Sequence, residues 1–206
     1  MLSGSACPYE STVAGALFYG PLSSILYLCS MRKLTTQELQ RQSAEEFAQA
    51  EKLPLVLVLD NIRSMHNVGS AFRTADAFAI EQIVLCGITA KPPHRDIHKT
   101  ALGATDTVKW THSPDTVEAL RSLKAEGYEL LAIEQIDQSV SLEEFNPEPG
   151  KKYALVFGNE VFGVDDKAIA ECDGAIEIPQ FGTKHSLNVS ISMGVVLWEL
   201  VRQLRF

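Results

Sequence analysis

The sequence has 206 residues, a length that fits one domain with at most a short appendage. Its residues are 46% hydrophobic, 8% aromatic and 21% charged, which excludes a disordered tail or a low-complexity array. The 18 Lys and Arg against 26 Asp and Glu give a net charge of -8. A surface that is basic throughout is therefore excluded, and any contact with nucleic acid must be confined to a local basic patch.

Residues 1–30 form an unusual N-terminal segment. They contain no Lys or Arg, and their apolar stretches are broken by Gly20-Pro21 and Ser23-Ser24. A secretory signal needs a basic start, and a membrane span takes about 20 apolar residues, so the segment fits neither. Because the composition changes abruptly at Met31, we expect natural translation to begin there and residues 1–30 to be non-native or poorly ordered. The alternative is a real N-terminal arm that packs poorly.

Residues 31–54 are predicted to form an N-terminal helical extension. Thr35 and Glu38 have the spacing of a capping box, and a polar, weakly amphipathic run continues to Lys52.

From there on, short apolar runs alternate with helical patterns. The predicted strands are 55–59, 82–86, 130–133, 154–157 and 175–178, with a weaker sixth at 107–111. The predicted helices are 68–78, 94–102, 114–126, 165–171 and 187–204. This alternation predicts an α/β fold with a largely parallel sheet and helices on both of its faces.

The cysteines lie far apart in the sequence, with no CxxC or other metal-ligand spacing: they are Cys7, Cys29, Cys86 and Cys172. This scatter argues against a disulfide framework or a zinc ribbon, and it predicts reduced thiols in a cytoplasmic protein.

Polar residues follow the first predicted strand, over residues 61–69. Ligands in open α/β sheets bind beyond the carboxyl ends of the strands, so this segment is a candidate site. Asn67 also suits the N-cap of the next helix, which would be a structural role alone. Arg73 lies farther along that helix, where the neighbouring residues Ala71, Phe72, Ala75 and Ala77 look buried, and an Arg on such a helix is usually held by an anion or a carboxylate.

A second polar cluster follows the strand at 154–157. Gly158 admits unusual backbone angles and the close approach of a ligand, and the carboxylate of Glu160 comes two residues later. The pattern by itself is weak, because glycines after strands are common turn residues and Glu160 could merely cap the next helix.

A third cluster, residues 178–190, joins the last predicted strand to the last helix. That helix has one apolar stripe, made of Val189, Met193, Val196 or Leu197, and Leu200. Ser186 and Asn188 lie at its entrance, where either could be a capping residue and nothing more.

Together and in this order, the three clusters resemble the three motifs of the SpoU/TrmH family of S-adenosylmethionine-dependent RNA 2′-O-methyltransferases, over about residues 55–206. The matching residues are Asn67, Gly69 and Arg73 in the first motif, Gly158 and Glu160 in the second, and Ile178-Pro179 through Gly182 to Ser186-Leu187-Asn188-Val189-Ser190 in the third. A departure is Gln180, where the family usually has Met. It bears on the packing of the cofactor pocket.

The resemblance implies a C-terminal segment that threads through a loop to form a deep trefoil knot, which periodicity alone would never suggest. It implies that the knot binds S-adenosylmethionine, with contacts from Gly158, Ile178 and Leu187. It also implies a homodimer packed through the knot, in which Arg73 faces the cofactor of the other subunit.

Methyl transfer to a ribose hydroxyl requires loss of the hydroxyl proton and an oxygen placed in line with the methyl group. Arg73 is the family's proposed activator, but a guanidinium stays charged in proteins and is a poor base. We therefore expect Arg73 to clamp the target phosphate and to stabilise negative charge on the oxygen. The other predicted catalytic residues, which would orient Arg73 and the ribose without a metal, are Asn67, Glu160, Ser186 and Asn188.

A basic patch is predicted to contact the RNA backbone, and its members are Arg63, His94, Arg95, His98, Lys99 and Lys184. His94 and His98 have the spacing of two metal ligands on one helical face, but their basic neighbours would repel a cation and no third ligand is evident.

Two other function classes compete with this interpretation. A dinucleotide-dependent oxidoreductase needs a GxGxxG turn after the first strand, and the segment NIRSMHNVG lacks it. A non-catalytic RNA-binding module would keep the basic patch but would need neither the cofactor loops nor Arg73. For the RNA target we slightly prefer tRNA over rRNA, because only about 54 residues precede the first strand and no basic extension follows the last helix.

Overall fold

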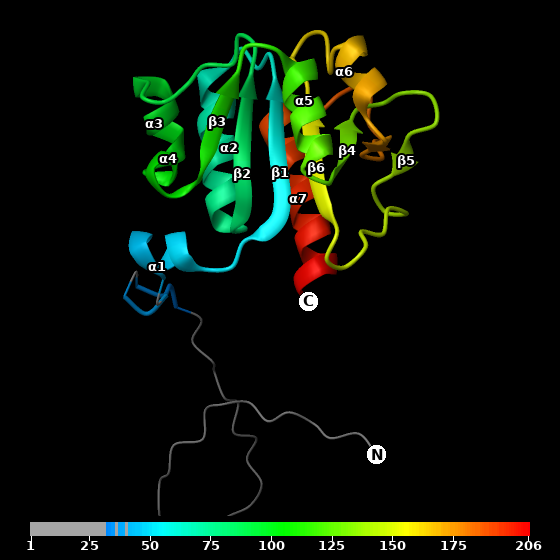
Figure 1. Ribbon diagram of the computed structural model, residues 1–206. Helices are drawn as coiled ribbons and strands as arrows, with labels where there is room; N and C mark the ends of the chain where they lie inside the picture. The colour runs from blue at the N-terminus through cyan, green and yellow to red at the C-terminus, as the bar shows by residue number, and fades with distance from the viewer. Residues whose placement is uncertain (1–31, 36, 40) are drawn as a thin grey trace, which may run out of the picture. The chain divides into compact units, whose positions relative to one another are not determined.

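A computed structural model describes residues 32–35, 37–39 and 41–206 (Figure 1). The predictions for residues 1–30 and for a start at Met31 lie outside these residues. The chain divides into two compact units, at residue 41. In the described part of the first unit, the Glu38 carboxylate accepts a hydrogen bond from the Thr35 backbone N–H at 2.8 Å and pairs with Arg32 at 2.6 Å.

The second unit, residues 42–206, is built on a parallel sheet. Its seven described strands lie in the order β3-β2-β1-β6-β4-β7-β5. They are β1 (Leu53–Asp60), β2 (Ile80–Cys86), β3 (Trp110–Ser113), β4 (Tyr128–Ile133), β5 (Val140–Ser141), β6 (Lys152–Phe157) and β7 (Gly174–Glu177). Each predicted strand has a counterpart here, and β5 alone had no predicted equivalent.

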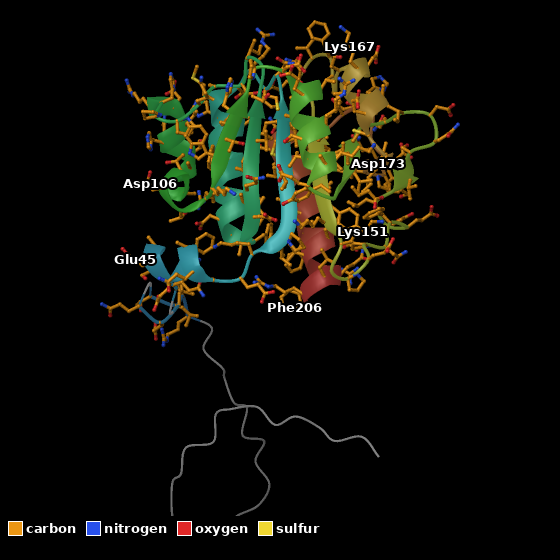
Figure 2. All side chains as sticks on the ribbon, in the orientation of Figure 1. Glu45, Asp106, Lys151, Lys167, Asp173 and Phe206 are labelled. Atoms are coloured by element: carbon orange, nitrogen blue, oxygen red, sulfur yellow. The ribbon has the colours of Figure 1, made fainter. Side chains whose placement is uncertain are left out.

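Helices cover both faces of the sheet, as predicted; in Figure 1, α5 lies in front of it and α7 behind. One face packs against α2 (Met65–Ala77), α3 (Arg95–Ala101), α4 (Ala104–Thr107) and α7 (Val189–Arg205). The other face packs against α5 (Thr116–Ala125) and α6 (Asp166–Glu171). Charged side chains lie on the outer surfaces, as Lys167 on α6 and Asp106 on α4 do in Figure 2.

Strand β1 shows why the continuous apolar runs predicted buried strands. Residues 55–59 are all 0% exposed. Leu55, Leu57 and Leu59 belong to the core on one face, and Val56 and Val58 to the core on the other. Because successive side chains of a strand point to opposite faces, a strand covered on both faces is apolar at every position.

The predicted helix from Thr35 to Lys52 is wrong in its extent. Within the described part of that segment, only α1 (Ala44–Gln49) is an α-helix. Thr35 and Glu38 do form the reciprocal contacts of a capping box, but these contacts enclose a turn. α1 has a capping box of its own, from Ser43 and Glu46, and no buried residue. It therefore lacks the packed apolar face that stabilises most protein helices.

The weak strand predicted at 107–111 also needs correction. It begins only at Trp110, because residues 104–107 form the short helix α4.

The last helix carries the predicted apolar stripe: Met193, Val196, Leu197 and Leu200 are all 0% exposed. No helix in the described parts of the chain is long and apolar enough to cross a membrane.

Candidate active site

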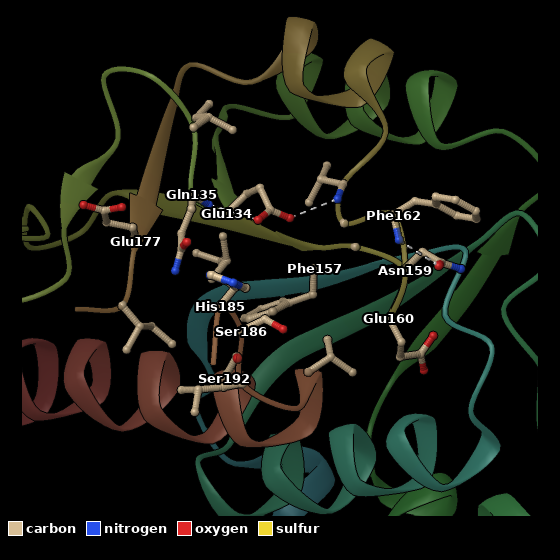
Figure 3. A pocket seen from close by; sticks show the side chains of 18 of the residues that line it. Glu134, Gln135, Phe157, Asn159, Glu160, Phe162, Glu177, His185, Ser186 and Ser192 are labelled. Atoms are coloured by element: carbon tan, nitrogen blue, oxygen red, sulfur yellow. Dashed lines mark hydrogen bonds between the residues drawn. The ribbon is translucent and has the colours of Figure 1, made fainter. Parts of the chain in front are cut away.

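A pocket of about 700 Å³ lies beyond the carboxyl ends of β4, β6 and β7 (Figure 3). Three separate stretches of the chain line it, drawn from residues 133–136, 157–169 and 176–192. Six predicted site residues are among them: Gly158, Glu160, Ile178, Ser186, Leu187 and Asn188. The second and third polar clusters therefore meet in one cavity. Gln180, the departure from the family pattern, lines it as well.

Gly158 is required by the tight turn that follows β6. A Cβ atom at this position would lie 2.0 Å from backbone atoms of both Gly163 and Val164, a separation that atoms cannot adopt. Asn159 and Gly163 form an antiparallel bridge, with N–H···O distances of 2.8 and 2.9 Å. Gly163 has a φ of 72°, in the left-handed region that favours glycine. The two glycines thus allow residues 158–164 to fold back and form one wall of the pocket.

The carboxylate of Glu160 joins the second cluster to the first. It accepts hydrogen bonds from the backbone N–H groups of Arg63 and Ser64, both at 3.0 Å, and from Asn67 Nδ2 at 2.9 Å. A carboxylate is favoured here because the first turn of α2 has unsatisfied N–H groups and a partial positive charge. The possibility that Glu160 caps the helix that follows it is wrong, since that helix, α6, is capped by Asp165.

Burial acts to raise the pKa of Glu160, but the hydrogen bonds it accepts from Arg63, Asn67 and Ser64 outweigh burial and leave the pKa below its ordinary value. The folded protein therefore favours the ionised carboxylate more strongly than the unfolded chain does. This stabilisation is complete above the unfolded-state pKa, near 4.5, and is lost as the pH falls through the lower folded-state pKa.

The variant Glu160→Gln tests this linkage. We expect it to be less stable than wild type at neutral pH, because its amide N–H₂ would face the N–H donors of α2. The difference in free energy of unfolding should shrink as the pH falls from the unfolded-state pKa, near 4.5, through the lower folded-state pKa. Urea unfolding between about pH 3 and pH 7 measures it, with Asp166→Asn as a control that removes a charge from the same pocket. A difference that stays constant across this range would contradict the role assigned to the charge.

Asn67 is not the N-cap of α2, contrary to one interpretation of the sequence. The cap is Ser64, whose Oγ accepts a hydrogen bond from the Asn67 backbone N–H at 3.3 Å. Asn67 is only 7% exposed, and its side chain donates to Glu160 instead. Asn67 thus links the helix to the pocket wall.

Gly69, which also matches the first motif, permits close packing of two helices. A Cβ atom there would lie 2.0 Å from Thr100 Oγ1 and 2.4 Å from the Ile97 carbonyl oxygen. Only glycine therefore lets α2 approach α3 this closely.

Asn188 caps α7: its Oδ1 accepts from the Ser190 backbone N–H at 2.9 Å and from Ser190 Oγ at 2.6 Å. The capping role considered for Asn188 is thus correct, and the residue lines the pocket at the same time. Ser186 lies two residues before the cap, exposed at the pocket wall.

Arg73 points away from the core. Arg73 itself is exposed. Of the neighbours expected to be buried, Ala71, Phe72 and Ala75 are 0% exposed, whereas Ala77, one turn later, is exposed. Within the described residues no carboxylate lies within 4.0 Å of it. It is also absent from the residues that line the pocket. The guanidinium is therefore open to an external anion.

The predicted basic patch lies outside the pocket. Arg95, His98 and Lys99 are exposed on α3, while His94 caps that helix and its Nδ1 accepts from the Asp96 backbone N–H at 3.2 Å. The side chains of Arg63 and Lys184 are exposed on loops. Across the described residues, no three His, Cys, Asp or Glu side chains gather as a metal site.

Two pocket residues were missed by the motif comparison. Asn159 Oδ1 accepts from the Val161 backbone N–H at 2.9 Å, and its Nδ2 donates to the Asn61 carbonyl at 2.8 Å. Glu134 Oε2 accepts from the Val164 backbone N–H at 3.3 Å. Glu134 directly follows β4, so the rule that singled out polar residues after strands would have found it.

The part of the chain that contains this pocket is similar to known proteins. Residues 54–198 match the model of the SpoU rRNA Methylase family. The tRNA (guanosine(18)-2'-O)-methyltransferase of Thermus thermophilus is 33% identical over 173 residues, which cover 84% of this chain and 86% of that protein. The 23S rRNA (guanosine-2'-O-)-methyltransferase RlmB of Neisseria meningitidis is 34% identical over 150 residues, covering 73% of this chain and 59% of that protein.

Two solved structures are similar. The A. aeolicus TrmH/SpoU tRNA modifying enzyme has a TM-score of 0.69 and 28% identity, covering 78% of this chain and 80% of that one. The AdoMet-bound rRNA methyltransferase from Sinorhizobium meliloti has a TM-score of 0.70 and 26% identity, covering 78% and 61%.

Proposed function

Because this chain belongs to the SpoU rRNA methylase family, we propose that it transfers a methyl group from S-adenosylmethionine to the ribose 2′-hydroxyl of an RNA. The observation that carries the proposal is the single pocket in which Gly158, Glu160 and the segment from Ile178 to Asn188 meet, with Glu160 bonded to Asn67. All three motifs are thereby joined in one place.

The pocket fits the proposed methyl donor. Its volume of about 700 Å³ lies within the usual range for small-molecule sites. Its lining includes four carboxylates and no Lys or Arg. S-adenosylmethionine carries a sulfonium and an ammonium against one carboxylate, so a negative lining favours it. When bound, it supplies an activated methyl group. Gly158, Ile178 and Leu187 are the residues proposed to hold it.

Arg73 is proposed as the catalytic residue that contacts the RNA. Its exposed guanidinium can bind the phosphate next to the target ribose and stabilise negative charge on the 2′-oxygen. The hydroxyl proton then passes to that phosphate or to water while the oxygen takes the methyl group. Asn67 and Glu160 act as positioning residues, because their hydrogen bond fixes the start of α2, the helix on which Arg73 lies. Ser186 and Asn188 are proposed to orient the ribose.

We also propose that residues 55–206 form the catalytic domain and that their C-terminal part is knotted. Support comes from the placement of the last elements: β7 lies between β4 and β5, and α7 packs with α2 on one face of the sheet. Residues 178–188, the segment that joins β7 to α7, line the pocket where a knot loop would hold the cofactor.

A homodimer is proposed, with α7 in the interface. Ile191, Val195 and Trp198 are 56%, 39% and 52% exposed, and their spacing places them on one side of α7. An apolar stripe of this kind, on a helix whose opposite side is buried in the core, is typical of an interface between subunits. The dimer would bring Arg73 of one subunit to the pocket of the other.

The proposed RNA is a tRNA, bound in part by exposed basic residues of α3. The match to the T. thermophilus tRNA enzyme covers 86% of that protein, whereas the match to the N. meningitidis rRNA enzyme covers 59% of that protein. This difference supports the preference for tRNA. Loss of phosphate contacts from Arg95, His98 and Lys99 would weaken RNA binding uniformly across sequences.

The test of the function is a methyl-transfer assay with the full chain, isotopically labelled S-adenosylmethionine and total tRNA, followed by nucleoside analysis. We expect label in 2′-O-methyl nucleosides, and calorimetry should give about one cofactor per subunit with a rise in thermal stability. Mapping 2′-O-methyl nucleotides in a strain that lacks the protein identifies the target. Cofactor binding without transfer to any RNA would favour the non-catalytic module, and absence of cofactor binding would remove the proposal.

A further inference from the structure

We infer that Glu134 makes the pocket selective for the positively charged methyl donor over its demethylated product, and so promotes product exchange. The inference rests on the proposed function. It concerns a residue outside the three motifs, at the carboxyl end of β4.

Glu134 lies at the centre of the pocket wall. Figure 3 shows its carboxylate between the end of β4 and residues 158–164, bonded to the Val164 backbone N–H. Its Oε1 accepts from the Gln135 backbone N–H at 3.0 Å. The fit against the loop is tight, because a Cβ atom at Gly163 would lie 2.3 Å from Glu134 Oε2. The two hydrogen bonds hold the carboxylate against this loop.

The other labelled acids of the pocket face elsewhere. Glu160 turns toward α2, where its oxygens accept hydrogen bonds from three N–H donors. Glu177 points outward from the cavity in Figure 3. Glu134 accepts from two backbone N–H groups and, within the described residues, has no cationic side chain within 4.0 Å. Glu134 therefore presents a negative charge in the pocket wall that no cationic side chain neutralises, while the fourth lining carboxylate, Asp166, lies in the first turn of α6.

The two cofactor forms differ by one charge. Methyl transfer converts a sulfonium into a neutral thioether, so the product carries one positive charge less than the donor. A fixed carboxylate in a partly buried wall attracts the donor more strongly than the product. When the carboxylate and the sulfonium lie a few ångströms apart and are screened as charges near a protein surface are, this loss of charge corresponds to a roughly tenfold difference in affinity.

Calorimetry with S-adenosylmethionine and S-adenosylhomocysteine tests the inference on the full-length protein. The measured quantity is the ratio of the two dissociation constants. Glu134→Gln preserves the shape and one acceptor oxygen but removes the charge, so we expect it to reduce the preference for the donor at least fivefold. Glu177→Gln is the matched control, and its ratio should stay within twofold of wild type.

The outcomes separate the inference from the function it rests on. If wild type binds both ligands and Glu134→Gln leaves the ratio unchanged, or if Glu177→Gln lowers it equally, the inference is wrong and the proposed function stands. If wild type binds neither ligand, both are wrong. Should Glu134→Gln not fold, wild type is titrated with both ligands at low and high salt, and a ratio that does not fall as salt rises overturns the inference.

Discussion

Arg73→Ala is expected to abolish methyl transfer while leaving folding and cofactor binding nearly intact. The guanidinium is exposed and no carboxylate holds it within the described chain, so its removal leaves no buried group without a partner. If it acts mainly in the transition state, its loss raises the barrier by ~3 kcal/mol or more, about a hundredfold in rate. Single-turnover rates, cofactor affinity and thermal stability should be measured on the same variant.

Two controls sharpen this test. Arg73→Lys should recover little activity, because an ammonium cannot replace the planar donor fork that a phosphate accepts. Arg121→Ala removes an exposed Arg from α5, on the opposite face of the sheet, and should leave the rate unchanged. An Arg73→Ala protein that is active but less stable would make Arg73 a structural residue and remove it from the mechanism.

Gly158→Ala is expected to weaken cofactor binding strongly. The added methyl group would lie 2.0 Å from backbone atoms of Gly163 and Val164, so the loop that forms one wall of the pocket must move. Overpacking of this kind costs about 1–3 kcal/mol of stability, and the displaced wall should weaken S-adenosylmethionine binding at least tenfold. Calorimetry and thermal unfolding measure the two effects.

Gly182→Ala is the matched control for that substitution. Gly182 lies in the third motif, but a Cβ atom there would meet nothing within 4 Å, and no positive φ excludes a side chain. Affinity and stability should therefore stay close to wild type. Equal losses in both variants would show that the third motif tolerates no substitution and that the close approach at Gly158 is not the cause.

Mixing the two inactive variants tests the shared site of the proposed dimer. If Arg73 of one subunit serves the pocket of the other, a heterodimer of Arg73→Ala and Gly158→Ala contains one intact site. Random exchange of subunits should then restore about a quarter of the wild-type rate. No recovery, in a mixture that sedimentation shows to be dimeric, would place Arg73 in its own subunit's site.

The sequence by itself determined six of the seven strands and six of the residues that line the pocket. Residues 55–59 are apolar at every position because both faces of β1 are covered. This continuous apolar run can be recognised from the sequence before the fold is known. Gly158 and Glu160 follow a strand and Asn188 precedes a helix; these positions made each a candidate, and the resemblance to the family motifs indicated a common site.

Only the tertiary structure decided how those residues are used. Glu160 bonds to Asn67, 93 residues away, and no local pattern distinguishes that contact from a cap on the following helix. Ser64 is the cap because α2 begins at Met65, which places Asn67 inside the first turn, with its side chain bonded to Glu160. Glu134 belongs to the pocket wall because it lies against the turn at Gly163 and accepts a hydrogen bond from the Val164 backbone N–H, 30 residues away. Helix and strand periodicity arises from near neighbours, whereas hydrogen bonds between loops depend on which strands the fold places side by side.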